Sequence, residues 1–182
     1  MQLNPIQFIP IALLKQPHLR QYAQQLYQQA FPAEDRFPFW GLRLFSLRPA
    51  IRFDAIVNSH HQPIGLVYLI HGEGLLYVLY FAIDAQCRSQ GYGSRIIAEL
   101  ERQYPSDTIV LDIRTPDTNA ADALQRQKRL DFYLRNGFHI APFEWVEAAE
   151  RYTVLYSRST QPYTALARLA VLLVLSAARH LV

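Results

Sequence analysis

The residues best suited to chemistry lie between Arg88 and Ser94, where Arg88, Gly91 and Gly93 stand in the spacing R-x-x-G-x-G. Glycine lets the backbone approach a ligand closely and adopt conformations that other residues avoid. Apolar residues at helical spacing follow at once, so the turn leads into the N-terminus of a helix. The unpaired N–H groups and positive dipole end of such a helix attract anions. The pattern therefore predicts a cradle for a phosphate or pyrophosphate, with Arg88 adding a charged contact at its edge.

Two common phosphate-binding motifs do not fit this stretch. A P-loop requires a lysine after its glycines, and none follows Gly93. A dinucleotide-binding fingerprint requires a βαβ unit near the start of the chain and a third glycine where this sequence has Ile96. A turn and helix start without any ligand is the alternative interpretation of the same residues.

The segment before the turn, residues 75–83, is almost wholly apolar, aromatic and branched, which predicts a buried strand. A strand, an R-x-x-G-x-G turn and a helix in this order resemble the acetyl-coenzyme A signature of the GNAT superfamily of N-acetyltransferases. The segment FYLRNGF at 132–138 resembles the F-Y-x-x-x-G-F segment of the same superfamily. The segments FPAEDR at 31–36 and QRQKRLDFYLRNGF at 125–138 resemble those of a poorly characterised bacterial subgroup of this superfamily.

The resemblance implies how acetyl-CoA, the acyl donor, would be held. The strand ending at Ile83 would splay from the following parallel strand, so that the pantetheine arm pairs with its free edge. The N–H of Ile83 would contact the acetyl carbonyl, where backbone donors stabilise a developing oxyanion. The residues expected to bind the cofactor are Ile83, Arg88, Ser89, Gln90, Gly91, Tyr92, Gly93, Ser94 and Asn119.

Tyr133 is the expected general acid, because a phenol with a pKa near 10 is suited to protonate a departing thiolate. The alternative is that Tyr133 only packs its helix onto the sheet. Asn119 resembles a cofactor-contacting asparagine of the family, although it stands fourteen residues before Tyr133 instead of the usual eight or so.

An amine acceptor is mostly protonated at neutral pH, so a base or a water chain must remove a proton. Glu34 is the first choice, because the loop around it is expected to overhang the acceptor. That loop, residues 31–38, is either a substrate wall or a surface loop held by aromatic residues. An aromatic wall would favour a small amphipathic amine; its members would be Phe31, Phe37, Phe39 and Trp40. The other candidate bases are Asp35, His71, Glu73 and Asp112.

The remaining elements follow from apolar periodicity and turn residues. Helices are expected at about 18–30, at about 40–45 and directly after Gly91. In the second of these, Trp40, Leu44 and Phe45 are expected to cover the core. A fourth helix is expected to run from a cap at Asn119 to about Arg135, with Gly137 as its stop. Strands are expected at 6–9, 51–58, 64–70, 75–83 and 108–113, followed by a closing hairpin of 138–146 and 152–157.

Composition limits the function classes. The formal net charge of +3 comes without a basic run of five residues, so a nucleic-acid interface is not expected. The single Cys87 fits a reducing cytoplasm, and direct acyl transfer needs no cysteine nucleophile. His60 and His61 precede Pro63 in a hairpin connection, and no metal site is expected.

We read no signal peptide at the start of the chain. The tail, residues 162–182, is expected to form an extra C-terminal helix that is too short in apolar length to span a bilayer. Because it is apolar nearly all round, it should be buried. We favour packing on its own domain or against a second subunit, which would give a homodimer, over a position on a membrane surface.

The sequence thus predicts a single α/β (α+β) domain over residues 1–182, with a core of about 3–157 and a mostly antiparallel mixed sheet flanked by helices. The expected function is acetyl transfer from acetyl-CoA to a primary amine of a small acceptor. The alternatives are a catalytically inactive acetyl-CoA-binding domain and a transferase of a longer acyl group. The acceptor, the acyl chain length, the general base and the oligomeric state stay open.

Overall fold

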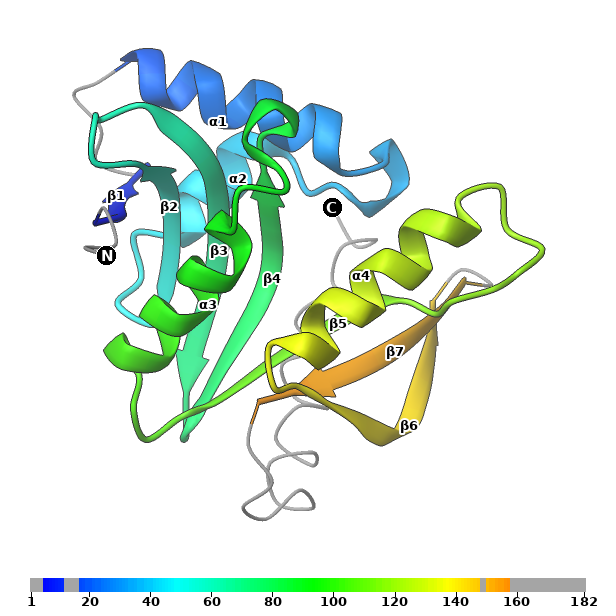
Figure 1. Cartoon of the computed structure of the whole chain (residues 1–182). Coiled ribbons are helices and arrows are strands. Elements are labelled where there is room, and N and C mark those ends of the chain that lie inside the picture. Colours follow the sequence, from blue (N-terminus) through cyan, green and yellow to red (C-terminus); the bar gives the residue numbers. More distant parts are fainter. Residues whose placement is uncertain (1–4, 12–16, 148–149, 158–182) are drawn as a thin grey trace. The chain divides into compact units, whose positions relative to one another are not determined.

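The computed structural model describes residues 5–11, 17–147 and 150–157. Seven strands form one mixed sheet in the order β1-β2-β3-β4-β5-β7-β6, with helices packed against it (Figure 1). The β4–β5 pair is parallel, and the pairs β1–β2, β2–β3, β5–β7 and β6–β7 are antiparallel. The expected α/β architecture with a mostly antiparallel sheet is confirmed.

The described residues fall into two compact units that share β4. Unit 1 comprises the chain up to His71 and Val78–Arg102, and unit 2 comprises Gly72–Tyr77 and the chain from Gln103 onward. The elements that begin unit 1 are β1 (Gln7–Pro10), α1 (Pro17–Ala30), the short 3-10 helix η1 (Ala33–Asp35), α2 (Phe39–Phe45) and β2 (Ile51–Val57). They are followed by β3 (Pro63–Gly72), β4 (Leu75–Ile83), the 3-10 helix η2 (Ala85–Cys87) and α3 (Tyr92–Gln103).

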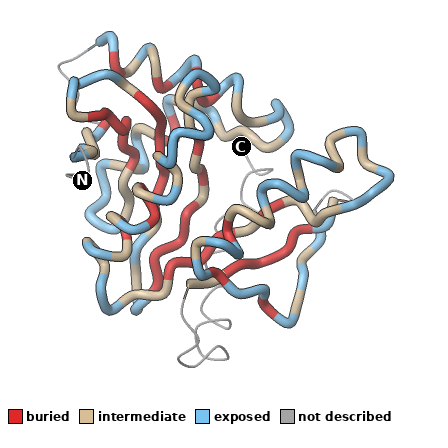
Figure 2. The backbone as a smooth tube through the Cα atoms, in the orientation of Figure 1, coloured by how far each residue is buried: buried red, intermediate tan, exposed pale blue. Residues whose placement is uncertain are grey.

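In unit 1, α1 and α2 cover one face of the strands and α3 covers the other (Figure 1). Side chains alternate between the two faces of a strand, and both faces here are covered by helices. This explains why β3 is apolar from Ile64 to Ile70 and β4 from Leu75 to Ile83. One face contributes Phe53, Ala55, Leu66, Tyr68, Tyr80 and Ala82 to a cluster with Ala23, Leu26 and Tyr27 of α1 and Leu42 of α2. Figure 2 shows the buried residues following these strands, with the exposed ones on the outer helix faces and turns.

Unit 2 is built on β5 (Thr108–Arg114), α4 (Ala123–Arg135), β6 (His139–Glu147) and β7 (Glu150–Tyr156). β5 lies between the first residues of β4 and β7, and β6 forms the edge. The predicted closing hairpin is confirmed as β6 and β7. Gly137 follows the C-cap residue of α4 with a positive φ of 83°, which confirms it as the helix stop.

The structure corrects the prediction for α2. The helix forms where expected, but the side chains of Trp40, Leu44 and Phe45 are 65%, 55% and 42% exposed. Leu42 is the residue that points into the core, at 2% exposure. A helix of seven residues turns only about half of its positions inward, and the apolar pattern alone did not identify which ones.

The predicted C-terminal helix at 162–182, and the homodimer expected to form through it, lie outside the described residues.

Candidate acetyl-CoA site

The candidate site in unit 1 begins at the end of β4, where the peptide linking Ala82 and Ile83 packs against Gly65 of β3. A Cβ atom placed on Gly65 would lie 2.6 Å from the carbonyl oxygen of Ala82, so this carbonyl is directed toward β3. No cis peptide occurs among the described residues, and a trans peptide turns its N–H opposite to its carbonyl. The N–H of Ile83 is therefore directed away from β3, toward the other edge of β4.

Two further contacts agree with this orientation. The next amide, that of Asp84, donates to the carbonyl of Ile64 on β3 at 2.9 Å, as the alternation along a strand requires. On the other edge, β4 and β5 pair only from Leu75–Tyr77 to Thr108–Val110. The ladder between β4 and β5 thus ends at Tyr77, before Ile83 is reached.

The turn after Ile83 is built mainly by local contacts. The Asp84 carboxylate accepts from the backbone N–H of Gln86 at 3.0 Å and starts η2. Ser89 and Gly91 both have positive φ, at 60° and 78°. The first helical bond of α3 runs from the N–H of Arg95 to the carbonyl of Gly91. We call residues 88–94 the cradle turn.

The N-terminus of α3 has the properties expected of an anion site. The amides of Tyr92, Gly93 and Ser94 precede the first intrahelical donor, and they carry the positive end of the helix dipole. A Cβ on Gly91 would meet nothing within 4 Å, so the space beside its backbone is open. Backbone donors of this kind attract anions in general, and the diphosphate of a coenzyme A stays the predicted ligand.

The polar side chains in and beside the cradle turn make contacts within the protein. Arg88 is exposed, and its Nε donates to the carbonyl of Ile83 at 3.3 Å. Gln90 is exposed and donates from Nε2 to the carbonyl of Gln86 at 2.8 Å. The Arg95 guanidinium lies over the ring of Tyr92, 5.2 Å from its centroid. The backbone is therefore the main candidate for the phosphate contact.

A link from α1 to Asp84, the residue between β4 and η2, was not predicted. The hydroxyl of Tyr22 donates to the Asp84 carboxylate at 3.2 Å, across 62 residues of sequence. Burial and the neighbouring Asp84 charge raise the pKa of Tyr22 and also that of the Cys87 thiol. A raised thiol pKa disfavours the thiolate, which agrees with the prediction that Cys87 is not a nucleophile.

The loop of residues 31–38, here called the acceptor loop, is held by buried tyrosines. Tyr80 of β4 donates to the carbonyl of Asp35 at 2.7 Å and accepts from the N–H of Phe37 at 3.3 Å. Tyr27 of α1 donates to the carbonyl of Phe37 at 3.1 Å. Glu34, the predicted base, is exposed on η1 within this loop.

The four residues of the predicted aromatic wall lie in two kinds of surroundings. Phe31, Phe37 and Phe39 pack against the buried cluster of unit 1, and the rings of Phe31 and Phe39 lie within 6.0 Å of the Tyr27 ring. Trp40 is exposed. The three phenylalanines are thus partly buried on the core, whereas Trp40 faces solvent, and a wall toward an amine acceptor stays a prediction.

Tyr133 of α4 belongs to unit 2. Its side chain is 7% exposed, and its ring contacts Phe132 and Phe138 edge to face at 5.0 and 5.4 Å. Burial raises the pKa of Tyr133 to about 12; the charge of Asp112 adds to this, whereas Arg129 opposes it. This ring packing agrees with the alternative interpretation, in which Tyr133 packs its helix onto the sheet, and its role as general acid stays a prediction.

The prediction that Asn119 caps α4 is wrong. The helix begins at Ala123 with Asp122 in the capping position, and Asn119 is exposed in the preceding turn. The side chain of Asp117 accepts from the Asn119 N–H at 2.8 Å, and this side-chain-to-backbone bond closes a separate turn before the helix. A cofactor contact from Asn119 stays a prediction.

An open, polar pocket of about 860 Å³ lies beside this turn in unit 2. Its charged side chains largely neutralise one another. Arg126 pairs with Asp122 at 2.7 Å and with Glu150 at 3.2 Å, and Arg114 lies 3.8 Å from Glu150. We read this network as a connection between the start of α4 and the strands β5 and β7.

The other predicted bases are spread over the molecule. Asp112 accepts a hydrogen bond from the hydroxyl of Tyr77 in unit 2. His71 and Glu73 are exposed at the β3–β4 turn, where Glu73 has a φ of 53°. Unit 1 therefore contains the cradle turn, the Ile83 amide and the loop of Glu34, whereas Tyr133 and Asn119 belong to unit 2.

Sequence reasoning missed Gly65, Tyr22 and the hydroxyl contacts of Tyr27 and Tyr80. Two signals were available in the sequence. A glycine inside a strand indicates a close approach of another backbone, and a buried tyrosine needs a hydrogen-bond partner for its hydroxyl. The partners themselves are not readable from the sequence.

Within the described ranges, no group of three or more His, Cys, Asp or Glu side chains is placed to hold a metal ion. In the same residues, no helix is long and apolar enough to cross a membrane.

Comparison with solved structures finds the same fold in acetyltransferases. A putative acetyltransferase from the GNAT family of Bacteroides thetaiotaomicron is 19% identical, with a TM-score of 0.73 over 91% of this chain and 93% of that one. An aminoglycoside 6'-N-acetyltransferase complexed with coenzyme A is 16% identical, with a TM-score of 0.67 over 87% and 99%. A spermidine N-acetyltransferase from Vibrio cholerae, in complex with CoA and spermine, is 14% identical, with a TM-score of 0.60 over 83% and 94%.

A search of curated protein sequences finds no significant match. The model of the Acetyltransferase (GNAT) family matches residues 17–138, which include α1, the acceptor loop, the cradle turn and Tyr133. That match covers more than half of the chain and agrees with the fold, so this protein belongs to the GNAT acetyltransferase family.

Proposed function

We propose that this protein transfers an acetyl group from acetyl-CoA directly to a primary amine of a small acceptor. The observation that carries the proposal is the continuous stretch from Ile83 to Ser94. A strand ends with an N–H directed away from its antiparallel neighbour, and a positive-φ turn and an open helix N-terminus follow at once. One segment thus offers a donor for a carbonyl and a cradle for a diphosphate, the two ends of an acyl-CoA.

The Ile83 amide is proposed to hold the thioester carbonyl. As the amine attacks, negative charge develops on this oxygen, and a donor already in place stabilises it. The amides of the cradle turn are proposed to bind the diphosphate, with further contacts from Arg88, Ser89, Gln90 and Asn119.

Tyr133 is proposed as the general acid. The C–S bond of the thioester breaks as the C–N bond forms, and the departing thiolate takes the phenolic proton. With its pKa raised to about 12, Tyr133 holds this proton throughout the neutral range.

Glu34 is proposed to accept a proton from the incoming amine. It stands exposed on the acceptor loop, where a protonated amine from solvent would meet it. Small amines are the proposed acceptors because proteins with the same fold, at 14–16% identity, act on spermidine and an aminoglycoside.

The test is a calorimetric titration of wild type, Gly91→Glu and Ala98→Glu with acetyl-CoA. Gly91→Glu places a carboxylate in the cradle turn, and we expect at least a hundredfold weaker binding, about 2.7 kcal/mol. Ala98→Glu adds the same charge at an exposed position of α3 and should bind like wild type. Equal binding by all three variants would remove the cradle from the proposal.

A screen of small amines, spermidine and an aminoglycoside among them, then separates the alternatives. Acceptor-dependent release of free CoA, with a product about 42 Da heavier because an acetyl group has replaced one amine hydrogen, supports the proposal. Binding without release indicates a catalytically inactive acetyl-CoA-binding domain. A larger mass shift with longer acyl-CoA donors indicates transfer of a longer acyl group.

A further inference from the structure

We propose that Tyr80 is a positioning residue: it holds the acceptor loop at a fixed place relative to the Ile83 amide, so that the acceptor side of the site is formed before an amine arrives. This inference rests on the proposed function, since it assigns the loop to the acceptor.

The hydroxyl of Tyr80 makes two bonds to the backbone of the loop. It donates to the carbonyl of Asp35 at 2.7 Å and accepts from the N–H of Phe37 at 3.3 Å. A phenol has one hydrogen to donate and lone pairs to accept, so both functions of the group are used. Phenylalanine would fill the same space but would leave a carbonyl and an N–H of the loop without these bonds.

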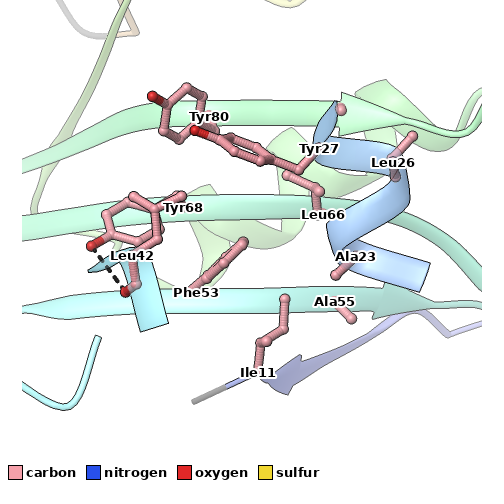
Figure 3. Packing of buried hydrophobic residues seen from close by; sticks show 11 residues of the cluster. Ile11, Ala23, Leu26, Tyr27, Leu42, Phe53, Ala55, Leu66, Tyr68 and Tyr80 are labelled. Atoms are coloured by element: carbon pink, nitrogen blue, oxygen red, sulfur yellow. Dashed lines mark hydrogen bonds between the residues drawn. The ribbon is translucent and has the colours of Figure 1, made fainter. Parts of the chain in front are cut away.

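The ring of Tyr80 is immobilised, which makes its hydroxyl a fixed point. Its side chain is 3% exposed, and its ring contacts Tyr27 and Phe31 edge to face at 4.9 and 4.8 Å. Figure 3 shows Tyr27, Tyr68 and Tyr80 side by side in the buried cluster, with their hydroxyls at the same end.

Tyr80 also connects the loop to the reacting centre. It stands three residues before Ile83 on the same strand, a separation of about 10 Å along β4. The loop that carries Glu34 and the proposed carbonyl donor are thus both attached to one rigid element.

Two other bonds reinforce this attachment. Tyr27 donates to the carbonyl of Phe37 at 3.1 Å, and Arg36 donates from a guanidinium nitrogen to the carbonyl of Gln28 at 3.3 Å. The backbone from Asp35 to Phe37 is therefore fixed on several sides, while the neighbouring Glu34 stays exposed. Loss of the Tyr80 hydroxyl should loosen the loop and leave the cradle turn unchanged.

The first measurement is hydrogen exchange of the Phe37 amide in wild type, Tyr80→Phe and Tyr68→Phe. The Phe37 amide should exchange at least about tenfold faster in Tyr80→Phe, because its hydrogen bond to the Tyr80 hydroxyl is lost. Tyr68→Phe is the matched control: Tyr68 is 2% exposed in the same cluster, but its hydroxyl donates to the carbonyl of Leu42, at 3.4 Å (Figure 3). Its Phe37 exchange should equal that of wild type.

Limited digestion with trypsin gives a second readout without activity. Cleavage after Arg36 should accelerate in Tyr80→Phe, whereas cleavage after Arg88 in the cradle turn should not. The ratio of the two rates within one sample corrects for any change in overall stability.

The kinetic test uses the panel amine that wild type acetylates with the highest kcat/KM. In Tyr80→Phe, we expect the acceptor KM to rise about tenfold, with the dissociation constant of acetyl-CoA unchanged. Tyr68→Phe should change neither quantity.

Each result decides part of the inference. Unchanged Phe37 exchange in a folded Tyr80→Phe protein would overturn the claim that this hydroxyl holds the loop. Faster exchange with an unchanged acceptor KM would overturn its role toward the acceptor. A wild-type protein that acetylates no amine would overturn the proposed function and that role together, whereas the exchange data would still decide whether Tyr80 holds the loop.

Discussion

The cradle turn and the acceptor loop lie in the same unit, but they are held in opposite ways. The contacts that shape the cradle turn are mostly short in sequence, such as Gln86 to Asp84 and Arg95 to Gly91. The acceptor loop depends on bonds that reach 10 residues from Tyr27 and 43 to 45 residues from Tyr80. The conformation of the turn thus depends mainly on its own residues, whereas the conformation of the loop depends on the fold of the unit.

Because the two regions are held separately, substitutions in each should change a different binding or kinetic constant. A change in the cradle turn should alter acetyl-CoA affinity, and a change behind the acceptor loop should alter the acceptor KM. Tyr133, which belongs to neither region, should alter kcat. The following experiments test this separation, from the largest expected effect to the smallest.

Tyr133→Phe should lower kcat by about 10²–10³-fold, because the thiolate loses its proton donor. The acetyl-CoA dissociation constant and the acceptor KM should stay within about twofold of wild type, because the substitution lies in neither the cradle turn nor the acceptor loop. Steady-state kinetics and titration on the same preparation measure all three. A kcat unchanged from wild type would assign Tyr133 to packing alone.

The pH profile of wild-type kcat checks the same role. A general acid works in its protonated form, and burial raises the pKa of Tyr133 to about 12. Ionisation of Tyr133 should therefore cause no loss of kcat between pH 7 and about 10. If an alkaline loss in that range disappears in Tyr133→Phe, the phenol ionises there and the expectation is wrong.

The double variant Tyr27→Phe/Tyr80→Phe removes every tyrosine hydroxyl bond to the Asp35–Phe37 backbone described above. The free energy of unfolding should fall by about 2–4 kcal/mol, since part-buried backbone groups lose these three hydrogen bonds. Acetyl-CoA affinity, corrected for the folded fraction, should not change. Urea denaturation of this variant beside Tyr68→Phe, which loses one hydroxyl, measures the difference.

Gly65→Ala probes the one point where the start of the site depends on a distant residue. Its Cβ would lie 2.6 Å from the Ala82 carbonyl, so the backbone of β3 or β4 must shift. We expect a loss of about 1–3 kcal/mol in unfolding free energy, together with weaker acetyl-CoA binding because the Ile83 amide moves. Gly72→Ala is the control, since a Cβ there meets nothing within 4 Å. Equal behaviour of the two variants would show that β3 does not position Ile83.

Ser89→Gly should have the smallest effect, and a stabilising one. Ser89 is exposed with a φ of 60°, a conformation that favours glycine, so unfolding free energy should rise by about 0.5 kcal/mol. Ser106→Gly, at an exposed turn position without positive φ, should instead lower it slightly. Thermal unfolding of both variants tests whether the cradle turn is set by local conformation.

Much of this molecule was predictable from its sequence because the relevant signals are local. The apolar run of 75–83, the glycines after Arg88 and the stop at Gly137 each constrain a few neighbouring residues, and the structure places strand, turn and helix end there. The cap predicted at Asn119 was wrong because another local interaction forms there instead. Asp117 offered a competing local bond, which the pattern of helix formers did not reveal.

The sequence by itself determined the order of elements, the cradle turn and the resemblance to the GNAT family, since these depend on backbone conformations and spacings within short segments. Only the tertiary structure decided that Trp40 is exposed while Phe39 packs inward, that Gly65 meets the Ala82 carbonyl, and that Tyr80 binds the acceptor loop. The physical reason is that a buried hydroxyl or a close backbone contact depends on which partner the fold brings to it. That partner lies tens of residues away, and no local preference specifies it.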